Sequence, residues 1–149
     1  MRHFDRGKVA EQHFAQQTGT LSGNPIAAEA GLATLEVLKR PGTYEGVHAT
    51  GLTLMEGLKR ALDEARVPAR VTGNPTCFEA FFTDTPVTDY RSMLRADAGK
   101  QKRFQALLLD QGVLKAESKF YVSTAHTAAD VDHAVDAFRS AAREMARGV

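Results

Sequence analysis

A run of hydroxyl-bearing and glycine residues directly before a helix start is the part of this sequence best suited to chemistry. It reads Thr18-Gly19-Thr20-Leu21-Ser22-Gly23-Asn24-Pro25. Asn24 is a favoured N-cap, and Pro25 suits the first helical position, where no backbone donor is required. Backbone N–H groups and hydroxyls at such a position can bind an anion. Loops of this composition more often serve only as a turn and a cap, and residue types alone favour that interpretation.

A second group of polar residues lies near the C-terminal end of the sequence. His126, Asp130 and His133 could suggest a metal site. A zinc site normally has four ligands and a supporting shell of hydrogen bonds, and no cysteine lies nearby, so no metal is predicted. Thr127 and Asp130 have the spacing of a capping box, with Asp in place of the usual Glu or Gln. We therefore expect these residues to begin a helix.

The elements that must position these groups alternate between helices and short strands. The sequence predicts helices over 25–40, 43–65, 87–111 and from Thr127 onward, and strands over 67–71, 77–83 and 120–124. Residues 1–17 are predicted as a loop with some extended structure. Gly73-Asn74-Pro75 is a strong turn signal, and Gly112 suits a helix C-cap. This order predicts an α+β domain.

The predicted core follows the helical spacing of apolar residues. Phe78, Phe81 and Phe82 make the second strand apolar enough to be central. The residues expected to share one face of each helix are Ile26, Ala30, Ala33 and Val37; Val47, Gly51, Leu54, Leu58 and Leu62; Tyr90, Leu94, Phe104, Leu107 and Leu108; and Val131, Val135, Phe138 and Ala142.

Composition narrows the classes of function. The chain has 149 residues, 43% of them hydrophobic, which is enough for one core of ordinary size. A formal net charge of +1 gives no reason to expect nucleic acid or an anionic membrane as a partner. No apolar run approaches the roughly 20 residues that span a bilayer. Cys77 is the single cysteine, expected to be a buried small hydrophobe, and its isolation suits a cytoplasmic protein.

The order of the residues along the chain indicates a protein family, which the residue types alone do not. The chain contains G-T-L-S-G-N-P-x-A-x-x-A-G-L-A-T-L-E, then Thr50-Gly51-Leu52 with Met55-Glu56-Gly57-Leu58, then Gly112-Val113 followed by Val122-Ser123-Thr124-Ala125-His126-Thr127. This series resembles the signatures of the class III (fold type I) pyridoxal-phosphate aminotransferases, in their glutamate-1-semialdehyde aminomutase-like branch. The three matches occur in the family's order over nearly all of the chain.

The resemblance implies a C-terminal portion of such an enzyme. Residues 1–24 would end the large-domain region and carry a phosphate-contact loop. Residues 25–149 would form the interdomain helix and the small domain, a short, mainly antiparallel sheet packed with helices. In the family, the Gly-Thr pair reaches the cofactor phosphate of the neighbouring subunit. Here that role falls to Gly19 and Thr20, with pyridoxal 5'-phosphate as cofactor, a homodimer as assembly and a small amino acid or amine as substrate.

The family's Schiff-base lysine, the aspartate at the pyridine nitrogen and the Gly-rich phosphate loop have no counterpart here. Lys8, Lys39 and Lys119 do not match the lysine by motif. We therefore expect a fragment or a truncated gene product that is inactive without the upstream region. The alternative is a non-catalytic truncated domain that acts as a dimerisation or binding module.

The sequence departs from the family between residues 116 and 124. Aminomutase-like relatives carry a Phe-Glu loop here, whose glutamate helps arrange the substrate site. In this chain the loop is shorter, no acid follows Phe120, and Lys119 occupies the region. Lys119 could pair with a substrate carboxylate, although an exposed lysine at a strand end is the favoured interpretation. The substrate therefore stays open between glutamate-1-semialdehyde and that of a related transaminase.

Overall fold

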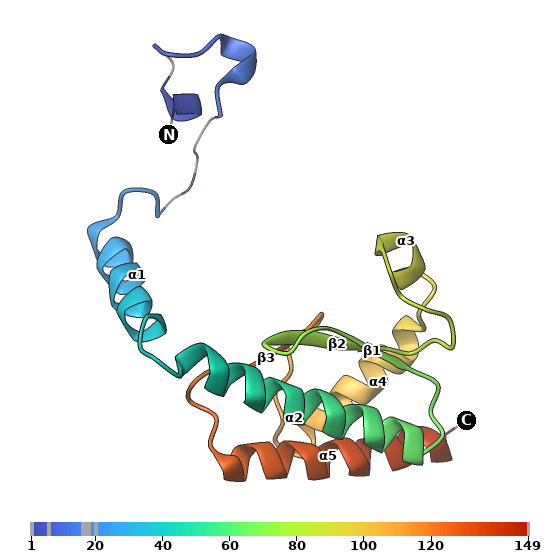
Figure 1. Cartoon of the computed structure of the whole chain (residues 1–149). Helices are drawn as coiled ribbons and strands as arrows, with labels where there is room; N and C mark the ends of the chain where they lie inside the picture. The colour runs from blue at the N-terminus through green and yellow to red at the C-terminus, as the bar shows by residue number, and fades with distance from the viewer. Residues whose placement is uncertain (1, 6, 16–18, 20, 149) are drawn as a thin grey trace. The chain divides into compact units, whose positions relative to one another are not determined.

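The computed structural model describes residues 2–5, 7–15, 19 and 21–148 (Figure 1). The chain divides into two compact units, Met1–Pro41 and Gly42–Val149, here called unit 1 and unit 2. The sequence-based division into 1–24 and 25–149 stays a prediction. Among the described residues, no helix has the length and apolar character needed to cross a membrane.

Unit 1 contains the 3-10 helices η1 (Arg2–Phe4) and η2 (Glu11–His13) and the helix α1 (Pro25–Leu38). As predicted, α1 begins at Pro25, because the side-chain oxygen of Asn24 accepts hydrogen bonds from the N–H groups of Ile26 (2.9 Å) and Ala27 (3.1 Å). The helix buries none of its residues, and Ile26 is 80% exposed. Of the apolar face predicted for α1, Ala30 and Ala33 are also exposed, and Val37 is half-buried.

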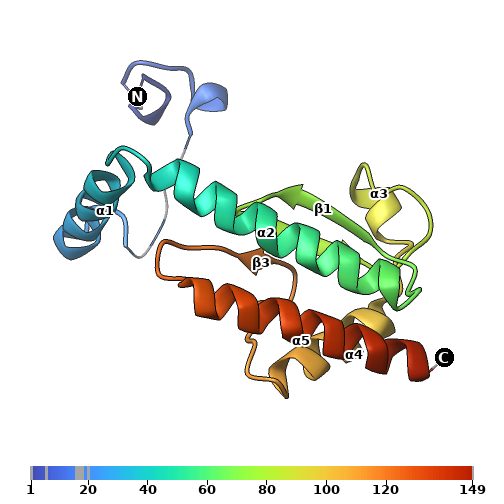
Figure 2. The same cartoon turned by 60° about the horizontal axis from the view of Figure 1, so that its bottom comes forward.

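Unit 2 combines two long helices with a small sheet. The helices α2 (Thr43–Glu64) and α5 (Ala128–Arg147) pack together side by side (Figure 2). The strands β1 (Arg70–Asn74), β2 (Cys77–Phe81) and β3 (Phe120–Tyr121) form an antiparallel sheet in the order β1-β2-β3. The central place of β2 and the α+β class are as predicted, while β1 begins three residues later than expected.

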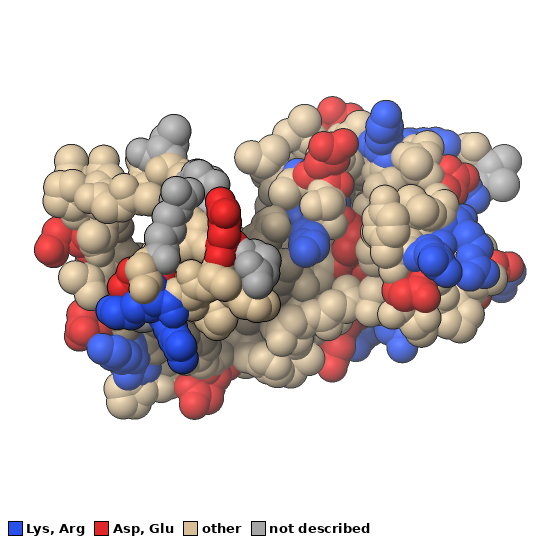
Figure 3. All heavy atoms as spheres, turned by 90° about the horizontal axis from the view of Figure 1, so that it is seen from above, with Lys and Arg blue, Asp and Glu red and all other residues tan. Residues whose placement is uncertain are grey.

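The core of unit 2 lies between this sheet and the helices. The ring of Phe78 stacks on that of Phe120, with 5.0 Å between centroids, and Phe120 meets the edge of Phe138 at 5.5 Å. Leu54, Leu58 and Leu62 of α2 and Phe138 and Ala142 of α5 are buried, which confirms the faces predicted for these helices. On the face drawn in Figure 3, acidic and basic side chains are intermixed over unit 2.

The single helix predicted over 87–111 is wrong. The chain forms a short helix α3 (Tyr90–Met93) and, after a break, α4 (Ala98–Leu109). The break arises at Asp97, whose carboxylate accepts from the N–H of Lys100 (2.9 Å) and whose own N–H donates to the carbonyl oxygen of Phe82 (3.0 Å). Asp97 therefore starts a new helix and cannot continue an old one.

Because of this break, part of the predicted core is wrong. Tyr90 and Leu94, expected to face inward, are 70% and 61% exposed. Phe104 and Leu108, on α4, are buried as expected. The helix ends as predicted near Gly112, whose positive φ of 78° lets the N–H of Val113 return to the carbonyl oxygen of Leu108 (2.9 Å).

Candidate functional site

The predicted phosphate-contact loop lies in unit 1, directly before α1. Thr20 lies outside the described residues. Around it, the N–H of Ser22 donates to the carbonyl oxygen of Gly19 (3.0 Å), and the N–H of Asn24 donates to that of Leu21 (3.1 Å). The described residues from Gly19 to Gly23 are exposed. Residues 21–23 form a turn that leads into the capped helix.

Gly19 is the residue of the predicted Gly19-Thr20 pair that the structure describes. A β-carbon at this position would lie 2.9 Å from Ser22 Oγ, a contact that rotation of the exposed Ser22 hydroxyl can relieve. No described residue accepts a hydrogen bond from the N–H of Gly19. Asn24, by contrast, uses its side chain to cap the helix. A backbone N–H group in a loop that precedes a helix is chemically suited to an anionic oxygen.

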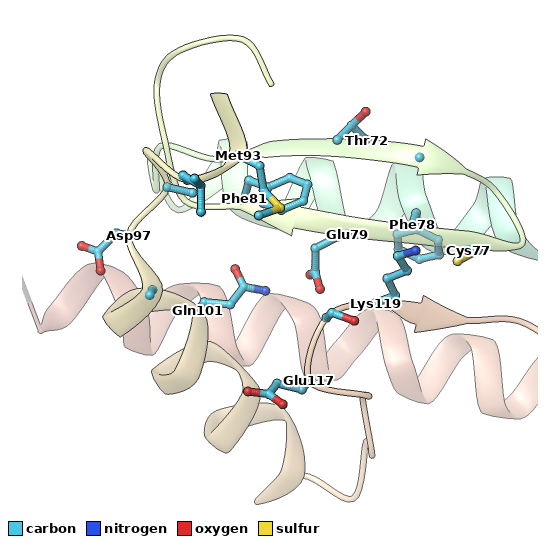
Figure 4. Close-up of a pocket in the computed structure, with 15 residues that line it drawn as sticks. Thr72, Cys77, Phe78, Glu79, Phe81, Met93, Asp97, Gln101, Glu117 and Lys119 are labelled. Atoms are coloured by element: carbon cyan, nitrogen blue, oxygen red, sulfur yellow. The ribbon is translucent and has the colours of Figure 1, made fainter. Parts of the chain in front are cut away.

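A cavity of about 490 Å³ lies in unit 2, on the side of the sheet that faces α4 and the segment 117–119 (Figure 4). Its walls are mainly apolar and include Phe81, Met93 and Leu94. Polar groups reach it from three elements: Glu79 on β2, Gln101 on α4 and Lys119 before β3. This size and lining are typical of small-molecule sites.

Glu79 forms a buried ion pair with Lys115. Lys115 Nζ lies 2.7 Å from Glu79 Oε2, and the two side chains are 0% and 5% exposed, respectively. Glu79 Oε1 accepts from the N–H of Ala80 (2.8 Å). Oε2 has no hydrogen-bond partner in the described part of the chain, so the ion pair with Lys115 is its polar contact. Burial raises the pKa of Glu79 above its ordinary 4.5, while the neighbouring Lys115 opposes that rise.

Sequence reasoning missed this pair. The one available signal was Glu79 itself, a charged residue inside the apolar strand Cys77-Phe78-Glu79-Ala80-Phe81. Charged side chains are almost never fully buried unless they are paired, so the strand required a cationic partner. Which lysine or arginine supplied it could not be known without the fold.

The other predicted residues have separate structural roles. Thr127 and Asp130 form the predicted capping box, because the N–H of Thr127 donates to Asp130 Oδ2 (2.8 Å). His133 Nε2 lies 2.9 Å from the carbonyl oxygen of Gln111, and His126 Nδ1 accepts from the N–H of Ser123 (3.1 Å). Cys77, expected to be buried, is half-buried at the cavity.

The chain was compared with protein-family models, with curated protein sequences and with solved structures. No family model matches the chain. A glutamate-1-semialdehyde 2,1-aminomutase from Desulfosudis oleivorans is 39% identical over 135 residues, which are 89% of this chain and 32% of that protein. An omega-transaminase from Sphaerobacter thermophilus has the same fold, with a TM-score of 0.77 and 30% identity, over 90% of this chain and 31% of the other. A transaminase with PLP bound, 20% identical, shares the fold alone, with a TM-score of 0.77 over 99% of this chain and 33% of its own length.

The fold and these matches define a class of protein. The chain belongs to the class III (fold type I) pyridoxal-phosphate aminotransferase family, of which it represents a C-terminal portion. Within that family it falls in the glutamate-1-semialdehyde aminomutase-like branch. The chain spans about a third of the length of the curated relatives it matches.

Proposed function

We propose that this chain is the C-terminal part of a pyridoxal-phosphate-dependent class III aminotransferase or aminomutase that transfers an amino group on a small amino acid or amine. The observation that carries the proposal is the 39% identity to a glutamate-1-semialdehyde aminomutase over 89% of the chain. The cofactor, when bound, supplies the electron sink for that chemistry. Without the upstream lysine, the chain is proposed to be inactive.

The part proposed for this chain is a contact to the cofactor phosphate. Gly19 would donate through its backbone N–H, and Thr20 through its hydroxyl and N–H. The N–H of Gly19 donates to no described residue, which supports this role. Neutral donors that converge on a dianion form strong charge-assisted hydrogen bonds.

The assembly and setting of the enzyme complete the proposal. In a homodimer, this loop would reach the cofactor held by the partner subunit. Residues 117–119, which line the cavity, would form part of the substrate-side wall. A cytoplasmic location and the status of a fragment are part of the same proposal, and the single cysteine suits the first of these. A non-catalytic binding module is not favoured, because the matched relatives are named as enzymes.

The phosphate contact is tested in a polypeptide that includes the upstream region. Thr20→Val should weaken retention of the cofactor during gel filtration, measured by the visible absorbance that stays with the protein. Thr20→Ser keeps a hydroxyl and is the matched control, so it should retain the cofactor. Equal retention by Thr20→Val and the parent would remove Thr20 from the phosphate site.

The inactivity of the chain by itself is a separate test. Cofactor is added to the 149-residue chain, the mixture is reduced with borohydride, and peptides are analysed by mass spectrometry. Only scattered, low-level labelling of exposed lysines is expected. A single lysine labelled stoichiometrically would contradict the proposal.

A further inference from the structure

Residues 116–119 belong to no helix or strand, and the last three of them form one wall of the cavity. Glu117, Ser118 and Lys119 all line the cavity. The segment begins several residues after the end of α4 at Leu109, and it precedes β3, a strand of only two residues. Backbone pairing within the sheet therefore does little to fix its conformation, and side chains must supply the constraint.

Lys115 supplies it by folding back on the residues that follow. Its Nζ donates to the carbonyl oxygens of Ala116 (2.9 Å) and Glu117 (3.3 Å) and lies 2.7 Å from Glu79 Oε2. Of the three donors of the ammonium, two are used by these carbonyl oxygens, while the contact with Glu79 Oε2 is an ion pair. Nζ also lies 5.2 Å from the centroid of the Phe120 ring, within the range of a cation–π contact.

Glu79, the partner of Lys115 in the ion pair, is held in a rigid part of the fold. Glu79 belongs to the central strand β2, and its second carboxylate oxygen accepts from the N–H of Ala80. The carboxylate therefore has a fixed direction, and it holds the ammonium where two backbone carbonyls can reach it. Gln105 Nε2 donates to the carbonyl oxygen of Lys115 (3.2 Å), which fixes the backbone from which the lysine side chain starts.

We propose that Glu79 and Lys115 are positioning residues that set the conformation of residues 116–119 and so the shape of this wall of the cavity. A purely stabilising role is a poor explanation, because two apolar residues of similar volume are often as stable as a buried ion pair, or more so. What apolar residues cannot supply is directed hydrogen bonding to the carbonyl oxygens of Ala116 and Glu117. In the complete enzyme this segment would shape the substrate side, a consequence that rests on the proposed function. The positioning itself needs no cofactor.

The test separates positioning from stability in the 149-residue chain. Backbone order parameters of residues 116–119 are measured by NMR relaxation, and thermal midpoints by circular dichroism. The variants are Lys115→Met, Glu79→Gln and the double variant Glu79→Leu/Lys115→Met. The control is Arg139→Met, which breaks the exposed ion pair with Asp136 (2.6 Å) on α5.

In the parent chain and in the control, residues 116–119 should have order parameters near 0.85, as in rigid backbone. In Lys115→Met and Glu79→Gln, the values should fall below about 0.6, while those of α4 stay high. The double variant leaves no unpaired buried charge, so its midpoint should return close to that of the parent while the segment stays mobile. If either single variant fails to fold, the order parameters of the double variant still test the proposal.

Two results would overturn the proposal. One is an ordered segment in the double variant, which would mean that packing alone sets its conformation. The other is a mobile segment in the parent chain, which would mean that the pair fixes nothing. Both results are independent of cofactor retention, so they leave the proposed phosphate contact of Gly19 and Thr20 unaffected.

Discussion

Gly51 of α2 lies directly against the backbone carbonyl of Pro75, in the turn that joins β1 to β2. A β-carbon at Gly51 would overlap the carbonyl oxygen and carbon of Pro75 and lie 3.0 Å from its Cβ. The helix and the sheet of unit 2 are therefore joined at a point where only glycine fits. Gly57, two turns further along α2, has a related contact, since a β-carbon there would lie 2.7 Å from Val135 Cγ2 on α5.

We predict that Gly51→Ala destabilises the chain by about 1–3 kcal/mol, because the added methyl group must displace backbone atoms. The free energy of unfolding by urea measures the effect. Gly46→Ala, on the same helix with no atom near the new β-carbon, is the matched control. It should stabilise by roughly 0.5–1 kcal/mol, through helix propensity. Equal effects of the two substitutions would show that the contact with Pro75 is unimportant.

Arg66 has the one positive φ value, 56°, among the described non-glycine residues. It follows α2 at the position where helices commonly end with glycine, and the N–H of Val67 returns to the carbonyl oxygen of Leu62 (2.9 Å). Arg66→Gly should therefore raise the free energy of unfolding by about 1 kcal/mol. Arg60→Gly, inside the same helix, should lower it by a similar amount. A loss of stability in Arg66→Gly would refute the strain argument.

The break between α3 and α4 depends on Asp97. Asp97→Ala removes the acceptor for the N–H of Lys100, and we expect a loss of about 1 kcal/mol in a denaturant titration. Asp110→Ala, at the opposite end of α4, removes a carboxylate from a helix C-terminus and should cost nothing or stabilise slightly. If both variants lose stability to the same degree, capping at Asp97 is not what starts α4.

The capping box of α5 predicts a dependence on pH. Hydrogen bonds from the backbone N–H and then the hydroxyl of Thr127 lower the pKa of Asp130 below its ordinary 3.8. A carboxyl with a lowered folded-state pKa stabilises the fold above its unfolded-state pKa, and this contribution is lost as the pH falls toward the folded-state value.

Below about pH 4, the thermal midpoint of the parent chain should therefore fall more steeply than that of Asp130→Asn. Asp132→Asn, at an exposed position on the same helix, is the control and should follow the parent. Parallel curves for the parent and Asp130→Asn would show that the carboxylate at the cap contributes no pH dependence.

Elements with strong local signals could be predicted from the sequence. Asn24-Pro25 and the Thr127/Asp130 spacing located two helix starts, because capping depends on a few neighbouring residues. The helical repeat of Leu54, Leu58 and Leu62 gave the buried face of α2. The sequence also predicts the turn between β1 and β2, although Gly73 and Asn74 belong to β1 and the turn itself lies at Pro75 and Thr76.

Features that depend on distant contacts could not be predicted in the same way. The start of α4 at Asp97 is accompanied by the hydrogen bond from Asp97 to Phe82, which lies 15 residues earlier in the chain. The partner of Glu79 is Lys115, and no local pattern connects them. For the loop before α1, the sequence supplied family residues, but the role of Gly19 and Thr20 depends on a cofactor and a second subunit, so it remains a proposal.

The pairing of α2 with α5 also has a consequence during synthesis. These two helices bury much of the core of unit 2, yet the region between them, from β1 to β3, separates them in the chain. While a ribosome translates that region, the apolar face of α2 has no helix to pack against. The core can therefore close only after α5 has left the exit tunnel, and the nascent chain presents an apolar helix to chaperones until then.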